Sequence, residues 1–167
     1  MRVSAKVDYA VRAAVELAVN AGKGPLKGDQ IATVQGIPLK FLESILSELR
    51  RAGMVRSQRG ADGGYWLAKP ADQISVADII RAVEGPLADV RGIPPEELEY
   101  GGAAGALKPV WIAARASLRA VLEVVTIDAL AKGARFSCRT PTCHPHPSFV
   151  RSAIGFVRLP FSRSAAC

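Results

Sequence analysis

Two short helical segments joined at a glycine restrict the fold of this sequence more than any other feature. The first covers Gly28 to Val34, and Ile31 and Val34 are predicted to face inward. Gly36 tolerates the left-handed turn that ends a helix. Pro38 suits the first position of the next helix, where its missing N–H costs nothing. The pattern therefore predicts a helix–turn–helix.

The second of these helices is predicted to run from Pro38 to Ala52, before Gly53, and to bury one face. Its apolar residues recur at the helical period and are Leu42, Ile45, Leu46 and Leu49. Its polar residues point the other way and are Lys40, Glu43, Ser44, Ser47, Arg50 and Arg51. An exposed polar face on the second helix is what a recognition helix needs in order to enter the major groove of DNA.

Residues 54–68 read as a β-hairpin with a glycine-rich loop at residues 60–64. Arg56, Gln58 and Arg59 stand next to this loop, and Arg59 could enter a narrow minor groove, where negative potential is concentrated. Tyr65 and Trp66, in the second strand, are expected to face the core or the backbone and not to stack on bases. The fold class predicted is mainly α with a small β-hairpin wing.

Three further helices are predicted, at residues 4–20 with Ser4 as the N-cap, at residues 76–83 with Ser75 as the N-cap, and at residues 109–131. Residues 87–108 are rich in Gly and Pro and are expected to be irregular. The last helix carries apolar residues at alternating spacings of three and four, which is a heptad seam that requires a partner helix. The predicted dimer interface is Trp111, Ala114, Leu118, Val121 and Val125.

These elements suggest three parts: a winged helix–turn–helix at residues 1–69, a linker helix, loop and dimerisation helix at residues 70–133, and a mobile basic tail at residues 134–167. The tail holds all three cysteines and both histidines. The tail offers sulfur and nitrogen ligands of the kind that zinc binds, at Cys138, Cys143, His144 and His146. The spacing of these residues fits no common closed zinc site. Free thiols in a mobile segment are the favoured alternative, and no metal site is predicted.

The net charge of +7 is unevenly placed, because basic residues exceed acidic ones in residues 1–69 and 134–167 but not in between. Charge alone is therefore weak support for DNA binding, and the same side chains could be solvated helix faces. No membrane span or secretory signal is apparent, so a cytoplasmic protein is expected. No catalytic triad, phosphate loop or dinucleotide motif is present, which argues against an enzyme.

Several segments together resemble the BadM/Rrf-two family of winged helix–turn–helix regulators, which includes the IscR, NsrR and CymR types. The resemblance covers about residues 1–133 and rests on Met1–Arg12, Gln35–Glu43, Leu49–Val55, Arg59–Tyr65 and Asp78–Pro86. It implies a homodimeric repressor that binds a palindromic operator in double-stranded DNA. It also implies that Glu43 reads bases and that Arg59 enters the minor groove.

One departure from that family concerns its cofactor. Members that sense iron, nitric oxide or redox state hold an iron–sulfur cluster through three cysteines, whereas residues 87–108 here contain neither Cys nor His. Asp8 occupies a position that serves as a further cluster ligand in some relatives, but one carboxylate cannot hold a cluster, so a surface or capping role is expected.

No cofactor is predicted, and the cluster-free CymR type suggests control of sulfur or cysteine metabolism together with a cysteine-biosynthetic enzyme. The alternative is an interaction protein, or a sensor of an unknown small molecule with another regulon.

Overall fold

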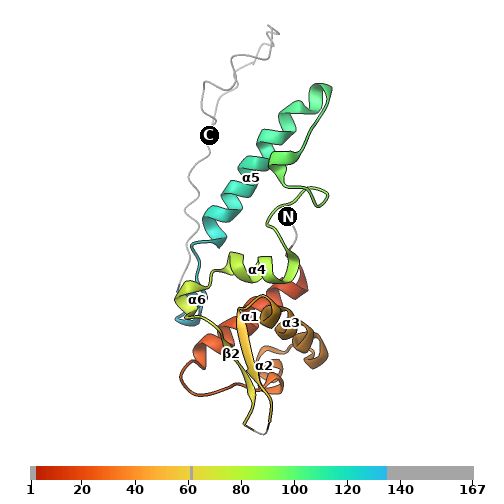
Figure 1. Cartoon of the computed structure of the whole chain (residues 1–167). Helices are drawn as coiled ribbons and strands as arrows, with labels where there is room; N and C mark the ends of the chain where they lie inside the picture. Colours follow the sequence, from red (N-terminus) through yellow and green to blue (C-terminus); the bar gives the residue numbers. More distant parts are fainter. Residues whose placement is uncertain (1–2, 61, 135–167) are drawn as a thin grey trace, which may run out of the picture. The chain divides into compact units, whose positions relative to one another are not determined.

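The computed structural model describes residues 3–60 and 62–134, which belong to one compact unit (Figure 1). The predicted class is confirmed, because the chain is mostly helical and carries one two-stranded antiparallel hairpin. No helix in this part of the chain is long and apolar enough to cross a membrane. The helices are α1 (Ala5–Val19), α2 (Gly28–Gln35), α3 (Leu39–Arg51), α4 (Val76–Glu84), α5 (Leu107–Leu122) and α6 (Ile127–Ala131), the strands are β1 (Val55–Gln58) and β2 (Gly64–Leu67), and short 3₁₀ turns are η1 (Ala71–Gln73), η2 (Pro95–Glu97) and η3 (Gly102–Ala106).

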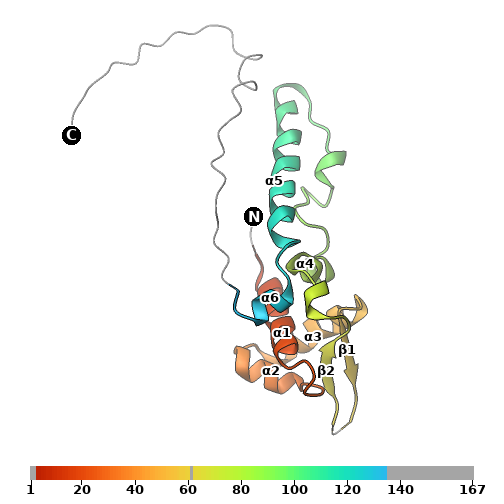
Figure 2. The same ribbon diagram turned by 90° about the vertical axis from the view of Figure 1, so that its left-hand side faces the viewer.

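The central element is α1, which contacts α2, α3, α4, α6 and β2 (Figures 1 and 2). Ser4 caps it as predicted, since its hydroxyl accepts a hydrogen bond of 3.2 Å from Val7 N. The small buried residues Ala10, Ala13 and Ala14 let the neighbouring elements approach it closely. One hydrophobic core therefore joins residues from both the first and the second predicted parts of the chain.

The helix–turn–helix is present, with two corrections to its details. Gly36 ends α2 in the left-handed conformation with φ of +61°, as expected. Val34, however, is 69% exposed, because the inner face of this short helix is formed by Ile31 and Ala32. Pro38 has an extended ψ of 123° and is the N-cap of α3, so the helix begins one residue later, at Leu39.

The hairpin that we call the wing pairs Val55 with Leu67 and Gln58 with Gly64. Its second strand is also bridged to the loop before α2, where Leu26 N and Tyr65 N donate to each other's carbonyl oxygens at 2.9 and 2.8 Å. Gly64 is required here, because a Cβ atom at this position would lie 2.7 Å from Leu26 O. The wing is thus fastened to the helical core along the outer edge of β2.

The start of α4 is fixed by a capping box, as the Ser75 side chain predicts. Ser75 Oγ accepts from Asp78 N, while the Asp78 carboxylate accepts from Ser75 N. Burial by itself raises the pKa of Asp78, but the hydrogen bonds from Ser75 and the charge of Arg81 outweigh this and hold that pKa below its usual value. The carboxylate therefore stays charged and acts as the N3 partner of the cap.

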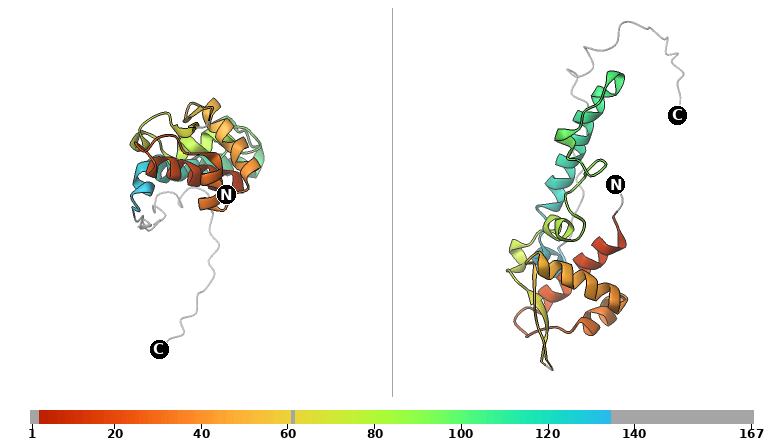
Figure 3. Two further views of the ribbon diagram at one scale, coloured as in Figure 1. Left: turned by 90° about the horizontal axis from the view of Figure 1, so that it is seen from below. Right: turned by 45° about the vertical axis from the view of Figure 1, so that its right-hand side comes forward.

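The single long helix predicted for residues 109–131 is wrong, because the chain leaves the helix after Leu122 and forms a separate α6 (Figures 2 and 3). Val76 N donates to Val125 O at 2.9 Å, and Ile127 N donates to Ile74 O at 2.9 Å. These bonds need an extended backbone at Thr126, which then caps α6 through its hydroxyl. Val125 consequently lies in the link between the helices and not on a continuous helical seam.

Candidate nucleic-acid interface

The outer face of α3 carries the polar residues expected of a recognition helix. Leu42, Ile45, Leu46 and Leu49 are fully buried, so the predicted inner stripe is confirmed and fixes the rotation of the helix. The opposite face is exposed at Lys40, Glu43, Ser44, Arg50 and Arg51, and Ser47 is half-buried. The structure therefore offers these six side chains on one solvent-facing surface, as a helix that enters a groove requires.

The wing adds a second polar surface directly after α3. Arg56 is paired with Trp66 and Gln58 with Gly64, and alternation along the strand puts Arg56 and Gln58 on the same face of the hairpin. Arg59 follows at the start of the tip and is exposed. Arg50 Nη1 donates to Ser57 Oγ at 3.4 Å, which links the end of α3 to the wing.

The ion pairs divide the basic residues into two groups. Within residues 71–134, every Lys and Arg except Arg91 lies within 4 Å of a carboxylate. Within the described residues from 20 to 70, no Lys or Arg forms such a pair. The unpaired group contains Lys23, Lys27, Lys40, Arg50, Arg51, Arg56, Arg59 and Lys69. Unpaired cations on one region of a protein are free to neutralise phosphates, whereas paired ones must first lose a partner.

Three of these cations share one hollow between α3 and the wing. This hollow has a volume of about 610 Å³, and its lining includes Arg50, Arg56 and Lys69. None of the residues that line it is acidic. Lys69 is absent from the residues that sequence reasoning selected. The signal that could have found it is its place directly after the second strand, at the base of the wing, where its charge adds to that of the arginines.

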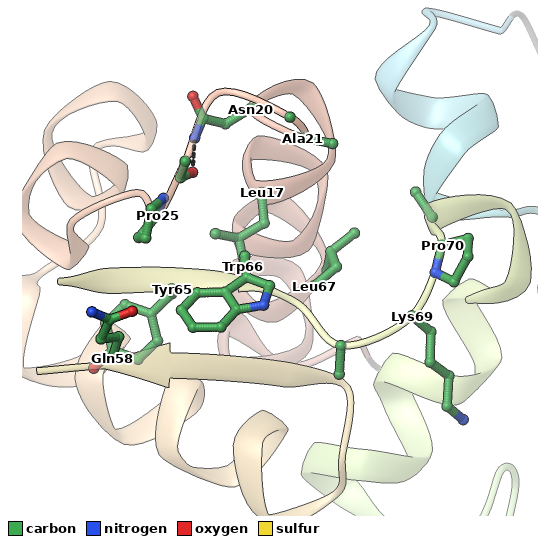
Figure 4. A pocket seen from close by; sticks show the side chains of 14 residues that line it. Leu17, Asn20, Ala21, Pro25, Gln58, Tyr65, Trp66, Leu67, Lys69 and Pro70 are labelled. Carbon is green, nitrogen blue, oxygen red and sulfur yellow. Dashed lines mark hydrogen bonds between the residues drawn. The ribbon is translucent and has the colours of Figure 1, made fainter. Parts of the chain in front are cut away.

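The two aromatic residues of β2 lie on opposite faces of the hairpin. Tyr65 packs against the core, as expected. Trp66 shares the outer face with Arg56 and is half-buried, so of the two placements expected for it, facing the core or lying beside the backbone, the first does not hold; strand alternation sends neighbouring side chains in opposite directions. Its indole lines a cavity that also includes Leu17 and Pro25 (Figure 4).

Side-chain contacts hold α1 against the helix–turn–helix. Lys6 Nζ lies 2.7 Å from Glu48 Oε2 on α3. Arg12 donates from Nε to Gln35 Oε1 at 3.0 Å, at the end of α2. Asp8 lies on the helix surface, where its carboxylate is 3.2 Å from Arg12 Nη1, so the expected surface role of Asp8 is confirmed. These contacts help fix the orientation of α2 and α3 relative to α1.

One side of α5 exposes apolar residues that nothing in the described chain covers. Trp111 is 37% exposed, Val121 is 62% exposed, and Ala114 lies on the same side at helical spacing. Leu118 is half-buried, and α5 as a whole contacts the chain's own η2, η3 and α4. Four of the five predicted interface residues therefore lie on one helix, and Val125 does not.

The comparisons with known proteins agree on one family. The model of the Rrf2 family, described as an iron-dependent transcriptional regulator, matches residues 3–133. A protein of Mycobacterium tuberculosis (strain CDC 1551 / Oshkosh) named as an HTH-type transcriptional regulator is 52% identical over 134 residues, which are 80% of this chain and 83% of that protein.

Two solved structures are similar to this one. The structure of CymR, the global cysteine regulator of B. subtilis, matches with a TM-score of 0.69 and 35% identity, over 81% of this chain and 99% of that one. The structure of T. potens IscR matches with a TM-score of 0.66 and 36% identity, over 81% of this chain and 89% of that one. Both similarities extend over about four fifths of this chain.

The iron named in the family description does not fit the side chains present here. Residues 1–137 contain neither Cys nor His, so the thiolates that hold iron–sulfur clusters are missing from residues 87–108. In that stretch Glu96 pairs with Arg115 and Glu99 with Lys108. In the described residues, no three Cys, His, Asp or Glu side chains come together as potential metal ligands. The two cysteines and two histidines considered for zinc lie outside the described residues.

Proposed function

The chain belongs to the Rrf2 family of transcriptional regulators, and we propose that it is a repressor that binds a palindromic DNA operator as a homodimer, without an iron–sulfur cluster. The observation that carries this proposal is the separation of the basic residues. Those between residues 20 and 70 are unpaired and lie from the loop after α1 to the base of the wing, while nearly all of those between residues 71 and 134 are in ion pairs. The segments expected to meet DNA are therefore the ones that carry free positive charge.

The proposed contacts follow from the chemistry of each side chain. Lys40, Arg50 and Arg51 neutralise phosphates and set the position of α3 in the major groove. Glu43, Ser44 and Ser47 meet base edges, and Glu43 accepts from a cytosine amino group. Arg59 enters the adjoining minor groove, flanked by Arg56 and Gln58. The sugar–phosphate backbone of DNA that separates the two grooves then passes beside the hollow lined by Lys69. We therefore add Lys69 to the residues proposed to bind phosphates.

Dimerisation through α5 accounts for the exposed apolar side of this helix. Trp111, Ala114 and Val121 would pack against the same residues of a second copy, with Leu118 at the border of the interface. Such a pair presents two wings to two half-sites, which is why the operator is expected to be palindromic. We retain the division into a DNA-binding part at residues 1–69 and a dimerisation part at residues 70–133 as a functional proposal.

The regulon proposed is sulfur or cysteine metabolism, because one similar structure is that of a global cysteine regulator. A cysteine-biosynthetic enzyme is then a candidate partner, and a cytoplasmic location follows from the need to reach DNA. No enzyme family is indicated by the comparisons. The alternative, a regulator of another regulon that senses a small molecule, is favoured by one observation, the cavity beside Trp66.

Replacing Arg59 with Ala is expected to weaken binding to a selected operator duplex by about 1–3 kcal/mol, because the guanidinium leaves a groove of strong negative potential. The measurement is fluorescence anisotropy at several salt concentrations, and wild-type affinity should fall steeply as salt rises. Arg91→Ala is the matched control, because Arg91 is also exposed and has no ion pair in the described residues, but it lies outside residues 20–70 and far along the chain from the wing. Equal losses in the two variants, or no salt dependence, would contradict the proposal.

Replacing Glu43 with Ala is expected to relax base preference at one position of each half-site, because the acceptor for a cytosine amino group is lost. Selection from a randomised duplex library, followed by sequencing, measures this preference for the variant and the wild type. Glu48→Ala is a useful comparison, since Glu48 on the same helix pairs with Lys6 and is not expected to read bases. An unchanged preference in Glu43→Ala would remove this residue from the reading of bases.

A further inference from the structure

A cavity of about 620 Å³ lies between the end of α1, the loop that follows it, and β2 (Figure 4). Its walls are largely apolar and include Leu17, Pro25, Trp66, Leu67 and Pro70. A volume within about 300–1,000 Å³ and an apolar lining with a few polar groups are typical of small-molecule sites. We propose that this cavity binds a small planar aromatic anion, such as an aromatic carboxylate, and that its occupation weakens DNA binding.

The aromatic character of the proposed ligand follows from Trp66. Its neighbours in β2, Tyr65 and Leu67, pack against the core, whereas Trp66 extends from the outer face of the wing and remains half-buried. In Figure 4 the indole is the central side chain of the lining, with Leu17 beyond it. A flat ring in this place offers a stacking surface to another flat, apolar ring.

The negative charge of the proposed ligand follows from the charges around the cavity. Lys69 is the one charged residue in the lining, and Figure 4 shows it at one end, with Gln58 at the other. Lys23, between the lining residues Gly22 and Gly24 in the chain, and Arg56, paired with Trp66 across the wing, carry further positive charge outside the lining. None of these three cations has a carboxylate partner in the described residues. Lys69 therefore gives the lining a positive charge that attracts an anion, which Lys69 can bind and Gln58 can hydrogen-bond.

The loop that forms one wall is already folded in the structure. Asn20 Nδ2 donates to Gly24 O at 2.9 Å, as the dashed line in Figure 4 marks. Gly22 and Gly24 have φ values of +81° and +98°, which only glycine adopts without strain. A ligand would not have to order this loop, so less binding free energy is lost than at a disordered site.

The effect on DNA rests on the proposed function, because the cavity and the proposed DNA surface share residues. Gln58 and Lys69 line the cavity and are also expected to meet DNA, and β2 leads directly from the wing tip to Trp66. An anion held by Lys69 removes a positive charge from the hollow between α3 and the wing. By linkage, the ligand must weaken DNA binding by the same factor by which DNA weakens ligand binding.

The first test uses the full chain without DNA and 2-naphthoate as the probe, measured by isothermal titration calorimetry. Trp66→Ala should weaken naphthoate binding by about tenfold through lost stacking area, and Lys69→Gln by about fivefold through lost charge. Lys23→Gln, which removes a nearby charge outside the lining, should change the affinity by less than about twofold. Ala21→Phe, which fills the cavity from an exposed position, should also block binding, and circular dichroism confirms that each variant is folded.

Three results would overturn the assignment. No binding heat at about 5 mM probe would exclude a useful site. Equal affinity in wild type, Trp66→Ala and Ala21→Phe would place the probe elsewhere, for example on the exposed side of α5. Equal affinity for the uncharged 2-naphthamide would overturn the anionic character of the ligand.

The second test adds the selected operator duplex. Saturating naphthoate should weaken duplex binding by about threefold or more, and the duplex should weaken naphthoate binding by the same factor. If both bind and neither affects the other, the regulatory part of the proposal is wrong. If the protein binds no duplex, the proposed function fails, but the calorimetric result still decides whether the cavity is a ligand site.

Discussion

Placing glutamates on the exposed apolar side of α5, in the double variant Ala114→Glu and Val121→Glu, is expected to give a folded monomer. Both positions are exposed in the single chain, so their replacement leaves the core intact. In a dimer the glutamates would bury like charges in an apolar interface. The free-energy cost of this burial exceeds the free energy gained from the apolar contact. Sedimentation velocity should show the mass of one chain where the wild type shows two.

The same variant should bind the operator duplex at least about 100-fold more weakly, because the second half-site no longer binds as part of the same molecule. Ala116→Glu is the matched control. It adds the same charge to an exposed alanine of α5 on the side opposite Ala114 and Val121. A dimeric double variant, or a control that also dissociates, would show that this side of α5 is not the interface.

Replacing Leu46 with Ala is expected to lower the free energy of unfolding by about 3 kcal/mol, because a fully buried side chain of α3 leaves a cavity in the core. In a domain of this size the melting temperature should fall by roughly 10 °C. Thermal unfolding followed by circular dichroism measures this change. DNA affinity at low temperature should stay near that of the wild type, since Leu46 faces away from the proposed DNA surface.

Lys40→Ala provides the comparison on the same helix. Lys40 is exposed and has no ion pair in the described residues, so its loss should change the stability by less than about 0.5 kcal/mol. The loss of Lys40 should instead weaken duplex binding. It should also reduce the slope of log affinity against log salt concentration by the amount expected for about one phosphate contact. A stable Leu46→Ala variant would mean that the core tolerates the cavity and that α3 is anchored by its other buried residues.

The parts of the fold that follow from local pattern could be predicted from the sequence. The stripe of Leu42, Ile45, Leu46 and Leu49 recurs at the helical period, so its burial requires only that α3 be a helix. Ser4 and Ser75 act on backbone N–H groups within three residues, so their capping roles are also local. The glycine-rich loop between two short apolar strands indicated the wing in the same way.

Residues whose environment depends on distant segments could not be predicted. A helical period through Val125 and Ala131 is compatible with one long helix, and only the hydrogen bonds to the segment before α4 end it at Leu122. Val34 has an apolar side chain and a suitable spacing, but the packing of α2 turns it outward. Trp66 is on the outer face because Tyr65 must reach the core.

For the candidate DNA surface, the sequence alone determined which side chains of α3 face outward and which basic residues stand in the wing. Only the tertiary structure decided which cations are free, because an ion pair such as that between Lys6 and Glu48 joins residues far apart in the chain. It also placed Lys69 beside Arg50 and Arg56 and left a cavity beside Trp66. The physical reason is that helical period and capping act over a few residues, whereas charge pairing and cavities depend on which distant segments pack together.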